Sequence, residues 1–506
     1  MFKNYLYKKD FNLNLFKNFL IFITPFLAVL GPFFPDLIIS LASIYLILNY
    51  KNFDTQKIFY SKFFIFMILF WIYLIINSFN SENLFVSFKS TLPYIRFILF
   101  IFFIKIFFDN KNSLKILLIS FSFLYILLLG DSIFQLNFGY NIFGYTLDAS
   151  GRVSSFFKDE LILGSFISKT FAVILFLIFF LNIKYKYFFY IIAILVSGFL
   201  IYISRERSAL FVFFLIFFFS MFLIEKKYFL RTFLLTFSLM SVTFLMNTNP
   251  IERIYFHTIK QFNETKGFFP SSRHYLHYLT AYKIFGEKPI IGGGVKSFRY
   301  LCDKDSFKPS EEDLIILSNG HYSTIDGYFY SSIIKSSKIS TFVFPANFYN
   351  KYKSHLNNKN ELSVLVNSNE IINKYHFQAK DFELNNFQKI HIKNGEFIKK
   401  DTLLMNSYPY KNGCSTHPHN FYLQILSELG LIGFIFLIFF YIYILKGFFI
   451  RIYDYIRNNK ISEEIVIYGF YVAVFFPLLT SGNFFNNYIS ILIYFPFSFI
   501  ILCQKK

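Results

Sequence analysis

Charged side chains are scarce in this chain of 506 residues, since Asp, Glu, Lys and Arg make up 16% of it and apolar residues make up 55%. That composition argues against a soluble domain and indicates a polytopic membrane protein. The chain also lacks a soluble segment with clustered basic residues, which a nucleic-acid-binding face needs. Its net charge of +20 comes from lysines and arginines between apolar runs, so we expect no nucleic-acid partner.

No small-residue cleavage site follows the first apolar segment, which begins near Phe19, and a second apolar run comes soon after it. We therefore expect a retained span rather than a signal peptide. A bilayer core needs about 20 apolar residues per helix. On that basis the sequence predicts twelve spans, at approximately 18–33, 36–50, 60–79, 88–108, 113–131, 161–181, 186–204, 208–224, 229–246, 421–445, 465–481 and 486–503.

Connections rich in lysine and arginine alternate along the chain with connections that are poor in them. Every second connection is basic, for example 51–62 and 446–460, whereas the short links 31–36 and 481–487 carry neither lysine nor arginine. The positive-inside rule then places both termini in the cytoplasm. Residues 247–420 fall outside, in the periplasm or its equivalent.

The predicted fold class is an all-α polytopic membrane protein with a large outer loop. Residues 1–246 form a bundle of about nine spans, residues 247–420 form the loop, and residues 421–506 form about three more spans. Within the loop, residues 303–412 alternate polar and β-favouring side chains. The pair Asn394-Gly395 predicts a hairpin between two short strands, so we expect a small β-rich insertion there.

Cysteine is rare, with three residues in the chain. Cys302 and Cys414 both fall in the outer loop and bracket the β-rich insertion, whereas Cys503 lies at the inner end of the last span. An oxidising compartment favours a disulfide between the two outer cysteines.

A metal site is the competing interpretation of the segment CSTHPH, because Cys414, His417 and His419 have short spacing. Zinc takes three or four ligands in a preorganised shell, and no second short cluster stands out. His274 and His277 lie one helical turn apart but could as easily be surface residues. We expect neither a metal nor another cofactor.

Arginine beside or within a membrane span is costly and marks a function or a water-filled cavity. Arg96 lies deep in the fourth predicted span. Four arginines fall at the outer face of the membrane: Arg152, Arg205, Arg207 and Arg273. Because arginine binds phosphate oxygens with two hydrogen bonds, this set indicates a polyanion site. Interfacial snorkelling or pairing with acidic neighbours such as Glu206 is the alternative for each one.

The glycines of PIIGGGV, residues 289–295, lack the Lys-Ser/Thr pair of a P-loop. We interpret them as a tight turn after a helix.

Four motifs in order resemble the bacterial O-antigen ligase and Wzy-type O-antigen polymerase superfamily. The main one is His-Asn followed after nine residues by Gly-x-x-Gly, here His419-Asn420 with Gly430 and Gly433. SRERSALF at 204–211, Arg273 through PIIGGGVKSF, and FFPLLTSGNFF at 475–485 are similar to further family segments. The resemblance covers most of residues 90–500, although the segment between PIIGGGV and HPHN is longer than the family pattern.

The resemblance implies a GT-C-like glycosyltransferase in the bacterial inner membrane with a periplasmic active site. Its donor would be a glycan on undecaprenyl pyrophosphate. Its acceptor would be lipid A-core in a ligase, or another lipid-linked glycan in a polymerase. Membrane lipids would be its other contacts.

Residue chemistry assigns roles within this framework. Neutral histidine suits the removal of a proton from an attacking hydroxyl, so His419 is the candidate base and His417 a weaker candidate. Fixed arginines can stabilise a departing pyrophosphate without a metal, a role for Arg205, Arg207 and Arg273, with Arg152 as a further ligand. Asn420 would orient His419 or cap the helix. The helix residues have structural roles: Gly430 and Gly433 permit close packing of a neighbouring helix or a lipid chain, and Glu428 is a buried pairing partner.

Two other classes of protein compete with a transferase. A transporter of lipid-linked glycans predicts ionisable residues deep in several spans and symmetry between halves, but Arg96 is the one deep charge and no repeat is visible. A non-catalytic assembly protein would use the outer loop to bind a partner.

Overall fold

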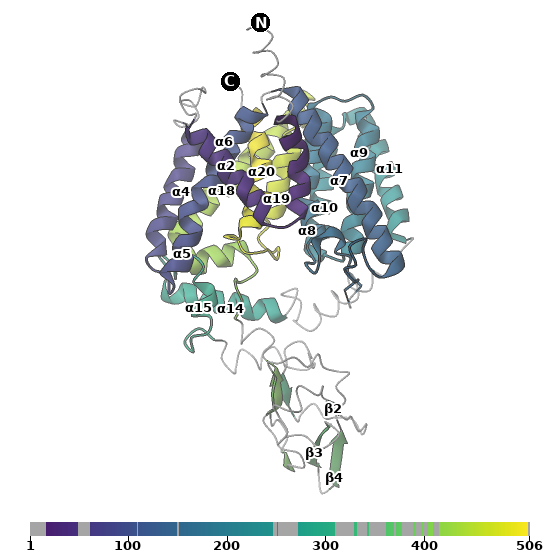
Figure 1. The fold of residues 1–506 in the computed structure, drawn as a ribbon. Coiled ribbons are helices and arrows are strands. Elements are labelled where there is room, and N and C mark those ends of the chain that lie inside the picture. The colour runs from purple at the N-terminus through teal and green to yellow at the C-terminus, as the bar shows by residue number, and fades with distance from the viewer. Residues whose placement is uncertain are drawn as a thin grey trace.

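The computed structural model describes residues 17–48, 61–108, 110–148, 151–245, 250, 272–308 and 414–503, with the backbone of short strands between 328 and 407. Helices dominate, and Figure 1 shows most of them side by side in one upright body. Before the outer loop they are Lys17–Val29, α2 (Phe33–Leu48), α4 (Lys62–Ser78), α5 (Leu84–Thr91), α6 (Ile95–Phe107), α7 (Lys111–Phe138), α8 (Leu163–Phe180), α9 (Lys186–Ser204), α10 (Arg207–Ser220) and α11 (Lys226–Leu245). Later helices are α14 (Ser272–Glu287), α15 (Phe298–Leu301), α18 (Phe421–Asn458), α19 (Ile465–Val474) and α20 (Asn487–Cys503).

The upright helices have the apolar character of a membrane protein. Among the described residues, 5 helices are long and apolar enough to cross a membrane, and several shorter helices are also apolar. Each segment predicted as a span from the sequence contains one of these helices or α11. The structure therefore confirms a mostly helical fold with several apolar helices that suit a membrane protein.

Helix ends differ from the predicted ones where a local backbone signal acts. The helix α7 continues past the predicted end to Phe138 and stops at Gly139, which adopts a left-handed conformation with φ of 79°. The fourth predicted span divides into α5 and α6, because Pro93 begins a 3-10 turn between them. The helix α18 runs on to Asn458, beyond the apolar stretch, into a polar segment.

Aromatic rings pack the interior between α4, α6, α18 and α20. Phe63 stacks on Phe497 with ring centroids 4.6 Å apart, and Phe97 stacks on Tyr494 at 5.8 Å. The deep charge noted in the sequence is neutralised, since Arg96 forms an ion pair of 2.6 Å with Asp36. Arg96 thus joins α6 to α2, which is a structural role.

A kink in α18 brings the glycine-rich loop against the helix. Gly430 has φ of 64° and ψ of −162°, which breaks the helical hydrogen-bond pattern. Loop residues 289–294 restore the lost bonds: Gly293 and Gly294 donate to the carbonyls of Ser427 and Glu428, both at 2.9 Å, and Leu431 donates to Pro289 at 2.8 Å. The glycine-rich segment is thus the turn that the sequence predicted.

Gly430 is needed at the kink for two reasons. Its positive φ is unfavourable for other residues, and a Cβ there would lie 2.4 Å from the carbonyl oxygen of Ile290. At Gly433 a Cβ would meet the side chain of Leu429. The close approach at Gly430 is therefore to a loop, whereas the sequence predicted packing of a helix or a lipid chain.

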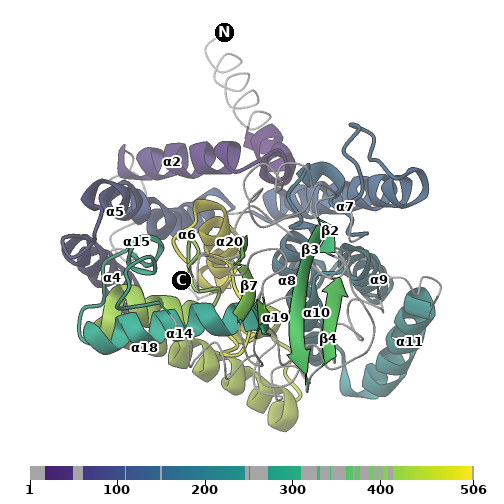
Figure 2. The same cartoon turned by 90° about the horizontal axis from the view of Figure 1, so that it is seen from below.

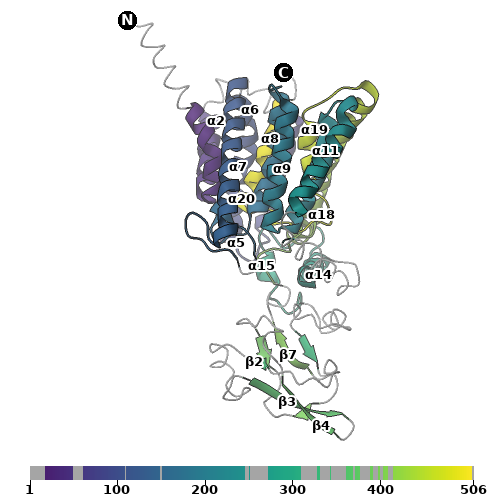
Figure 3. The ribbon, with the colours of Figure 1, turned by 90° about the vertical axis from the view of Figure 1, so that its right-hand side faces the viewer.

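Short strands follow α15 in the chain. One sheet has the antiparallel order β1 (Tyr328–Tyr330), β7 (Leu403–Ser407), β5 (Gln388–Ile390), and another has β2 (Phe342–Val343), β3 (Glu361–Ser368), β4 (Ile371–His376) with β6 (Phe397–Ile398) parallel to β3. Figure 3 shows the strands beyond α14 and α15.

The predicted hairpin around Asn394-Gly395 differs from the structure in its second strand. The turn itself lies outside the described residues, but β5 pairs with β7 and β6 pairs with β3. Polar residues at 399–401 divide the apolar stretch after the turn, so β6 and β7 are separate strands. It is β7, and not β6, that pairs with β5.

Candidate active site

The segment 414–420 leads directly into α18 and is fixed at its first residue. A disulfide joins Cys414 to Cys302, with 4.9 Å between their Cα atoms. Both cysteines are buried in a small apolar cluster with residues of α14 and α15, including Ile284 and Phe298. The disulfide is the pairing expected from the sequence, and it holds the start of the segment against the end of α15.

Four histidine rings gather where this segment meets α14. The ring centroid of His419 lies 4.1 Å from that of His417, 5.1 Å from that of His274 and 5.3 Å from that of His277. From the sequence, His274 and His277 could as easily be surface residues. That interpretation is corrected: α14 packs against α18, and His277 is 1% exposed.

His419 has an unusual backbone conformation for a residue that is not glycine. Its φ is +58°, its carbonyl oxygen accepts a hydrogen bond of 2.8 Å from the amide of Ser481, and its Nε2 lies 3.3 Å from Oγ of Ser415. Left-handed backbone in such a residue carries strain, which surrounding contacts must stabilise. The contacts therefore fix the imidazole in one place among the other histidines.

Burial keeps the two histidines of the segment neutral. Desolvation, with a smaller effect of His277, lowers the pKa of His419 to about 4. Desolvation and the nearby His419 lower the pKa of His417 to about 3. At neutral pH both rings are uncharged, so each has a nitrogen lone pair that can accept a proton.

Asn420 acts as the N-cap of α18. Its Oδ1 accepts hydrogen bonds from the amides of Tyr422 at 3.0 Å and Leu423 at 3.1 Å, and its Nδ2 donates to the carbonyl of Pro477 at 2.8 Å. The same amide therefore caps the helix and ties it to the segment 475–485. Of the roles expected from the sequence, the structure gives it the cap.

The segment 475–485 is also bonded to α18 by Gln424. Its Nε2 donates to Oδ1 of Asn483 at 3.0 Å, and its Oε1 accepts from the amide of Phe484 at 2.9 Å. Nε2 also lies 3.1 Å from Oε2 of Glu428, whose side chain is 0% exposed. Glu428 is thus the buried pairing partner that the sequence predicted.

The histidine cluster does not have the form of a metal site. Among the described residues, no group of three or more His, Cys, Asp or Glu side chains is placed to hold a metal ion. Cys414 is engaged in the disulfide, and Nδ1 of His417 lies 3.0 Å from Oγ1 of Thr416.

Arg152 is held by the link between α9 and α10. Its guanidinium donates to the carbonyl of Ser204 at 3.2 Å and to that of Leu161 at 2.8 Å, and it lies 3.8 Å from Oε1 of Glu206. Glu206 also accepts from the amides of Gly164 at 2.8 Å and Ser165 at 3.1 Å. These contacts give Arg152 the pairing role that was the alternative in the sequence.

Arg205 and Arg207 lie on the same link. Arg205 has φ of +56°, and its guanidinium packs so closely on Gly151 that a Cβ there would lie 2.8 Å from Cζ. Arg207 is the first residue of α10. Arg273 is the second residue of α14, and its side chain lies outside the described part of the chain.

One contact pathway connects this link to the histidines. One turn after Arg207, the ring of Phe211 lies 5.2 Å from that of Phe476, and the next residue, Pro477, accepts the hydrogen bond from Asn420. The first turns of α10 therefore connect the link to the segment 475–485, which is bonded to Asn420.

Comparison with protein-family models, with curated proteins and with solved structures gives no significant match to this chain.

Sequence reasoning missed two cations beside the histidine segment. Lys296 ends the glycine-rich loop with φ of +58°, and Arg299 follows it in α15. Both are partly buried, and they lie near the segment, since Glu428 affects the pKa of Lys296 and Arg299 affects that of His417. The sequence VKSFR contains both cations. Without the docking of the loop on α18, however, it is indistinguishable from an ordinary surface segment.

Proposed function

We propose that this chain is an O-antigen ligase-like glycosyltransferase of the bacterial inner membrane. It moves a glycan from undecaprenyl pyrophosphate to a sugar hydroxyl of lipid A-core. The observation that carries the proposal is the fixed and neutral His419, which lies at the start of α18 among three other histidines. Nine residues separate Asn420 from the Gly430 kink, and this kink gives the motif a structural meaning.

His419 serves as the general base in this proposal. The attacking sugar hydroxyl loses its proton as the new glycosidic bond forms, and a neutral imidazole accepts it. A pKa of about 4 makes His419 a weaker base than an ordinary histidine. A bound pyrophosphate would raise that pKa, because a nearby negative charge favours the protonated imidazole.

The arginines stabilise the departing pyrophosphate. When the bond between the sugar and the pyrophosphate breaks, its electron pair stays on the pyrophosphate of the carrier lipid and adds a negative charge there, and fixed guanidinium groups near those oxygens lower the barrier. Arg205 and Arg207 fill this role with Arg273. Arg152 supports them, since it fixes the backbone of the link at Ser204.

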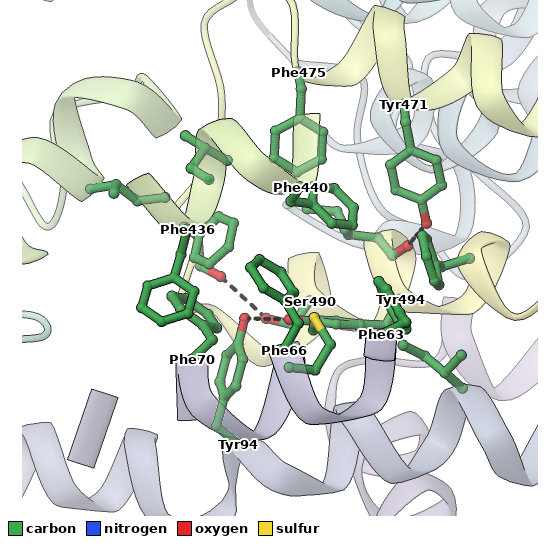
Figure 4. Close-up of a pocket in the computed structure, with 17 residues that line it drawn as sticks. Phe63, Phe66, Phe70, Tyr94, Phe436, Phe440, Tyr471, Phe475, Ser490 and Tyr494 are labelled. Atoms are coloured by element: carbon green, nitrogen blue, oxygen red, sulfur yellow. Dashed lines mark hydrogen bonds between the residues drawn. The ribbon is translucent and has the colours of Figure 1, made fainter. Parts of the chain in front are cut away.

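An apolar cavity supports a lipid-linked substrate. Figure 4 shows it between rings of α4, α6, α18, α19 and α20, including Phe66, Phe436 and Phe440. Ile425 and Phe484 also line it, and they belong to α18 and to the segment bonded to α18 near His419. Hydrocarbon entering the cavity would carry its headgroup toward the histidines.

The proposal includes a topology of twelve spans with both termini in the cytoplasm and residues 247–420 in the periplasm. Two observations support it. Figure 1 shows α14 and α15 across the end of the helical body opposite the end of α20. The disulfide between Cys302 and Cys414 suits an oxidising compartment on that side.

Transfer by the purified chain tests the proposal. Proteoliposomes would receive a glycan on undecaprenyl pyrophosphate together with lipid A-core, or with a second lipid-linked glycan in its place. We expect glycan on lipid A-core, detected by mass spectrometry. Product on the lipid-linked glycan alone would identify the chain as a polymerase and not a ligase. No product with either acceptor would contradict the transferase and favour transport or assembly.

A further inference from the structure

Two groups of cations lie on different flanks of the helical body. Figure 2 shows α8, α9 and α10 on one flank and α5 and α15 on the other. The first flank carries Arg205 and Arg207. The second carries Lys89 at the end of α5, Lys296 in the glycine-rich loop and Arg299 in α15. A single pyrophosphate requires one such group, so the second calls for a separate explanation.

The second group, Lys89, Lys296 and Arg299, is built on a rigid support. The loop that carries Lys296 is hydrogen-bonded to the kink of α18, and Oγ of Ser81 donates to the carbonyl of Val295 at 3.3 Å. A Cβ at Gly294 would lie 2.5 Å from the backbone of Ser81. The loop therefore lies wedged between α18 and the turn before α5, where its side chains have fixed directions.

Two cations of this group, Lys296 and Arg299, lack carboxylate partners among the described residues. Nε of Arg299 is buried and has no hydrogen-bond partner among the described residues. Neither Lys296 nor Arg299 forms a salt bridge with any carboxylate that the structure describes. A buried guanidinium nitrogen without a partner costs free energy unless a ligand completes it.

The effects of these cations on pKa values indicate that they lie near one another and near His417. Burial, then Arg299, and then more weakly Lys89 lower the pKa of Lys296, against Glu428, which raises it. Arg299 also contributes to the lowered pKa of His417. The carboxylate of Glu428 is already taken up by Gln424 and by the amide of Phe298 at 3.2 Å, so it does not neutralise the cations by direct pairing.

We infer that Lys296 and Arg299, with Lys89 at the rim, form a second anion site that binds a phosphate group of the acceptor glycolipid. The inference rests on the proposed function, because it assigns the pyrophosphate of the donor to the arginines of the other flank. The two anions would then approach His419 from different flanks, which places the acceptor hydroxyl between them. Lipid A is an acceptor class with phosphate groups of this kind.

Binding to two lipid probes tests the inference in the full-length chain in detergent. The probes are undecaprenyl pyrophosphate, for the donor headgroup, and diphosphoryl lipid A, with monophosphoryl lipid A as a charge-reduced form. For Arg299→Gln we expect about tenfold weaker binding of diphosphoryl lipid A, as for one lost charged hydrogen bond. Binding of undecaprenyl pyrophosphate should stay unchanged, and Arg299→Lys should restore part of the loss.

The matched control is Lys304→Gln, which removes a cation of the same region that is paired with Glu82 at 2.6 Å. It should leave both probes unaffected. Unchanged lipid A binding in Arg299→Gln, or equal weakening of both probes in that variant and in Arg299→Lys, would overturn the second site. If the wild-type chain does not bind undecaprenyl pyrophosphate, it is the proposed function that fails.

Discussion

The two charged regions beside the histidine segment differ in how their charges are satisfied. Around Glu206, the carboxylate accepts two backbone amides and lies 3.8 Å from Arg152, which in turn donates to two carbonyls. Around Arg299, a buried nitrogen has no partner among the described residues. The pair of Glu206 and Arg152 is completed by the protein and holds the fold, whereas Nε of Arg299 is left for a ligand.

The largest effect should come from breaking the first region. Glu206→Gln leaves Arg152 without its carboxylate in a buried setting, and removal of one partner of a buried pair costs about 3–5 kcal/mol. We expect a clear loss in the free energy of unfolding, measured in detergent by thermal or denaturant unfolding. Glu82→Gln is the control, since its pair with Lys304 is exposed and is worth about 0–1 kcal/mol. Equal losses in the two variants would remove the distinction.

The disulfide anchors the second region to the histidine segment. Replacing Cys302 and Cys414 together by serine should lower stability by about 2–4 kcal/mol. It should also slow transfer, because Cys414 fixes the start of the segment that carries His419. Cys503→Ser, at the free cysteine, is the matched control for both measurements. Full activity of the double variant, or of the chain under reducing conditions, would show that this anchor is dispensable.

The kink of α18 is the other support of the second region. Gly430→Ala places a Cβ 2.4 Å from the carbonyl oxygen of Ile290 at a positive φ, at a cost of about 1–3 kcal/mol. We expect lower stability and weaker binding of lipid A, since the loop with Lys296 must move. Gly130→Ala, in α7 with open space around it, should be neutral or stabilising by up to about 1 kcal/mol. Similar behaviour of the two variants would count against a loop held by the kink.

The pH dependence should be the smallest effect near neutrality. With a pKa of about 4 for His419 in the free protein, kcat/KM for transfer should stay constant from neutral pH to about pH 5, one unit above that pKa, and fall by half near pH 4. Because the folded pKa lies below the ordinary 6.5, the unfolded chain binds more protons between these values. Stability is therefore complete above pH 6.5 and declines as the pH falls toward 4. Half-loss of kcat/KM near pH 6.5 would show that His419 is not desolvated in the free protein.

Sequence predicted the features that depend on composition and on nearby residues. The lengths of the apolar runs located the helices, and the position of Cys302 and Cys414 in the same outer loop predicted their disulfide. Contacts between distant segments were harder to predict. His274 and His277 join His419 only because α14 docks on α18, and Arg299 reaches the site only because Gly430 breaks that helix. The β5 pairing was missed since a hairpin turn signal does not exclude a longer-range partner.

The rate of glycan transfer by His419→Ala is the most direct test of the central claim. Single-turnover transfer from undecaprenyl pyrophosphate would be measured on the purified wild-type chain and on the variant, together with binding of the donor. We predict a rate about 10²–10⁴-fold lower, the usual loss for a general base, with donor binding unchanged. A variant that transfers glycan at the wild-type rate would contradict the assignment of His419 as the base.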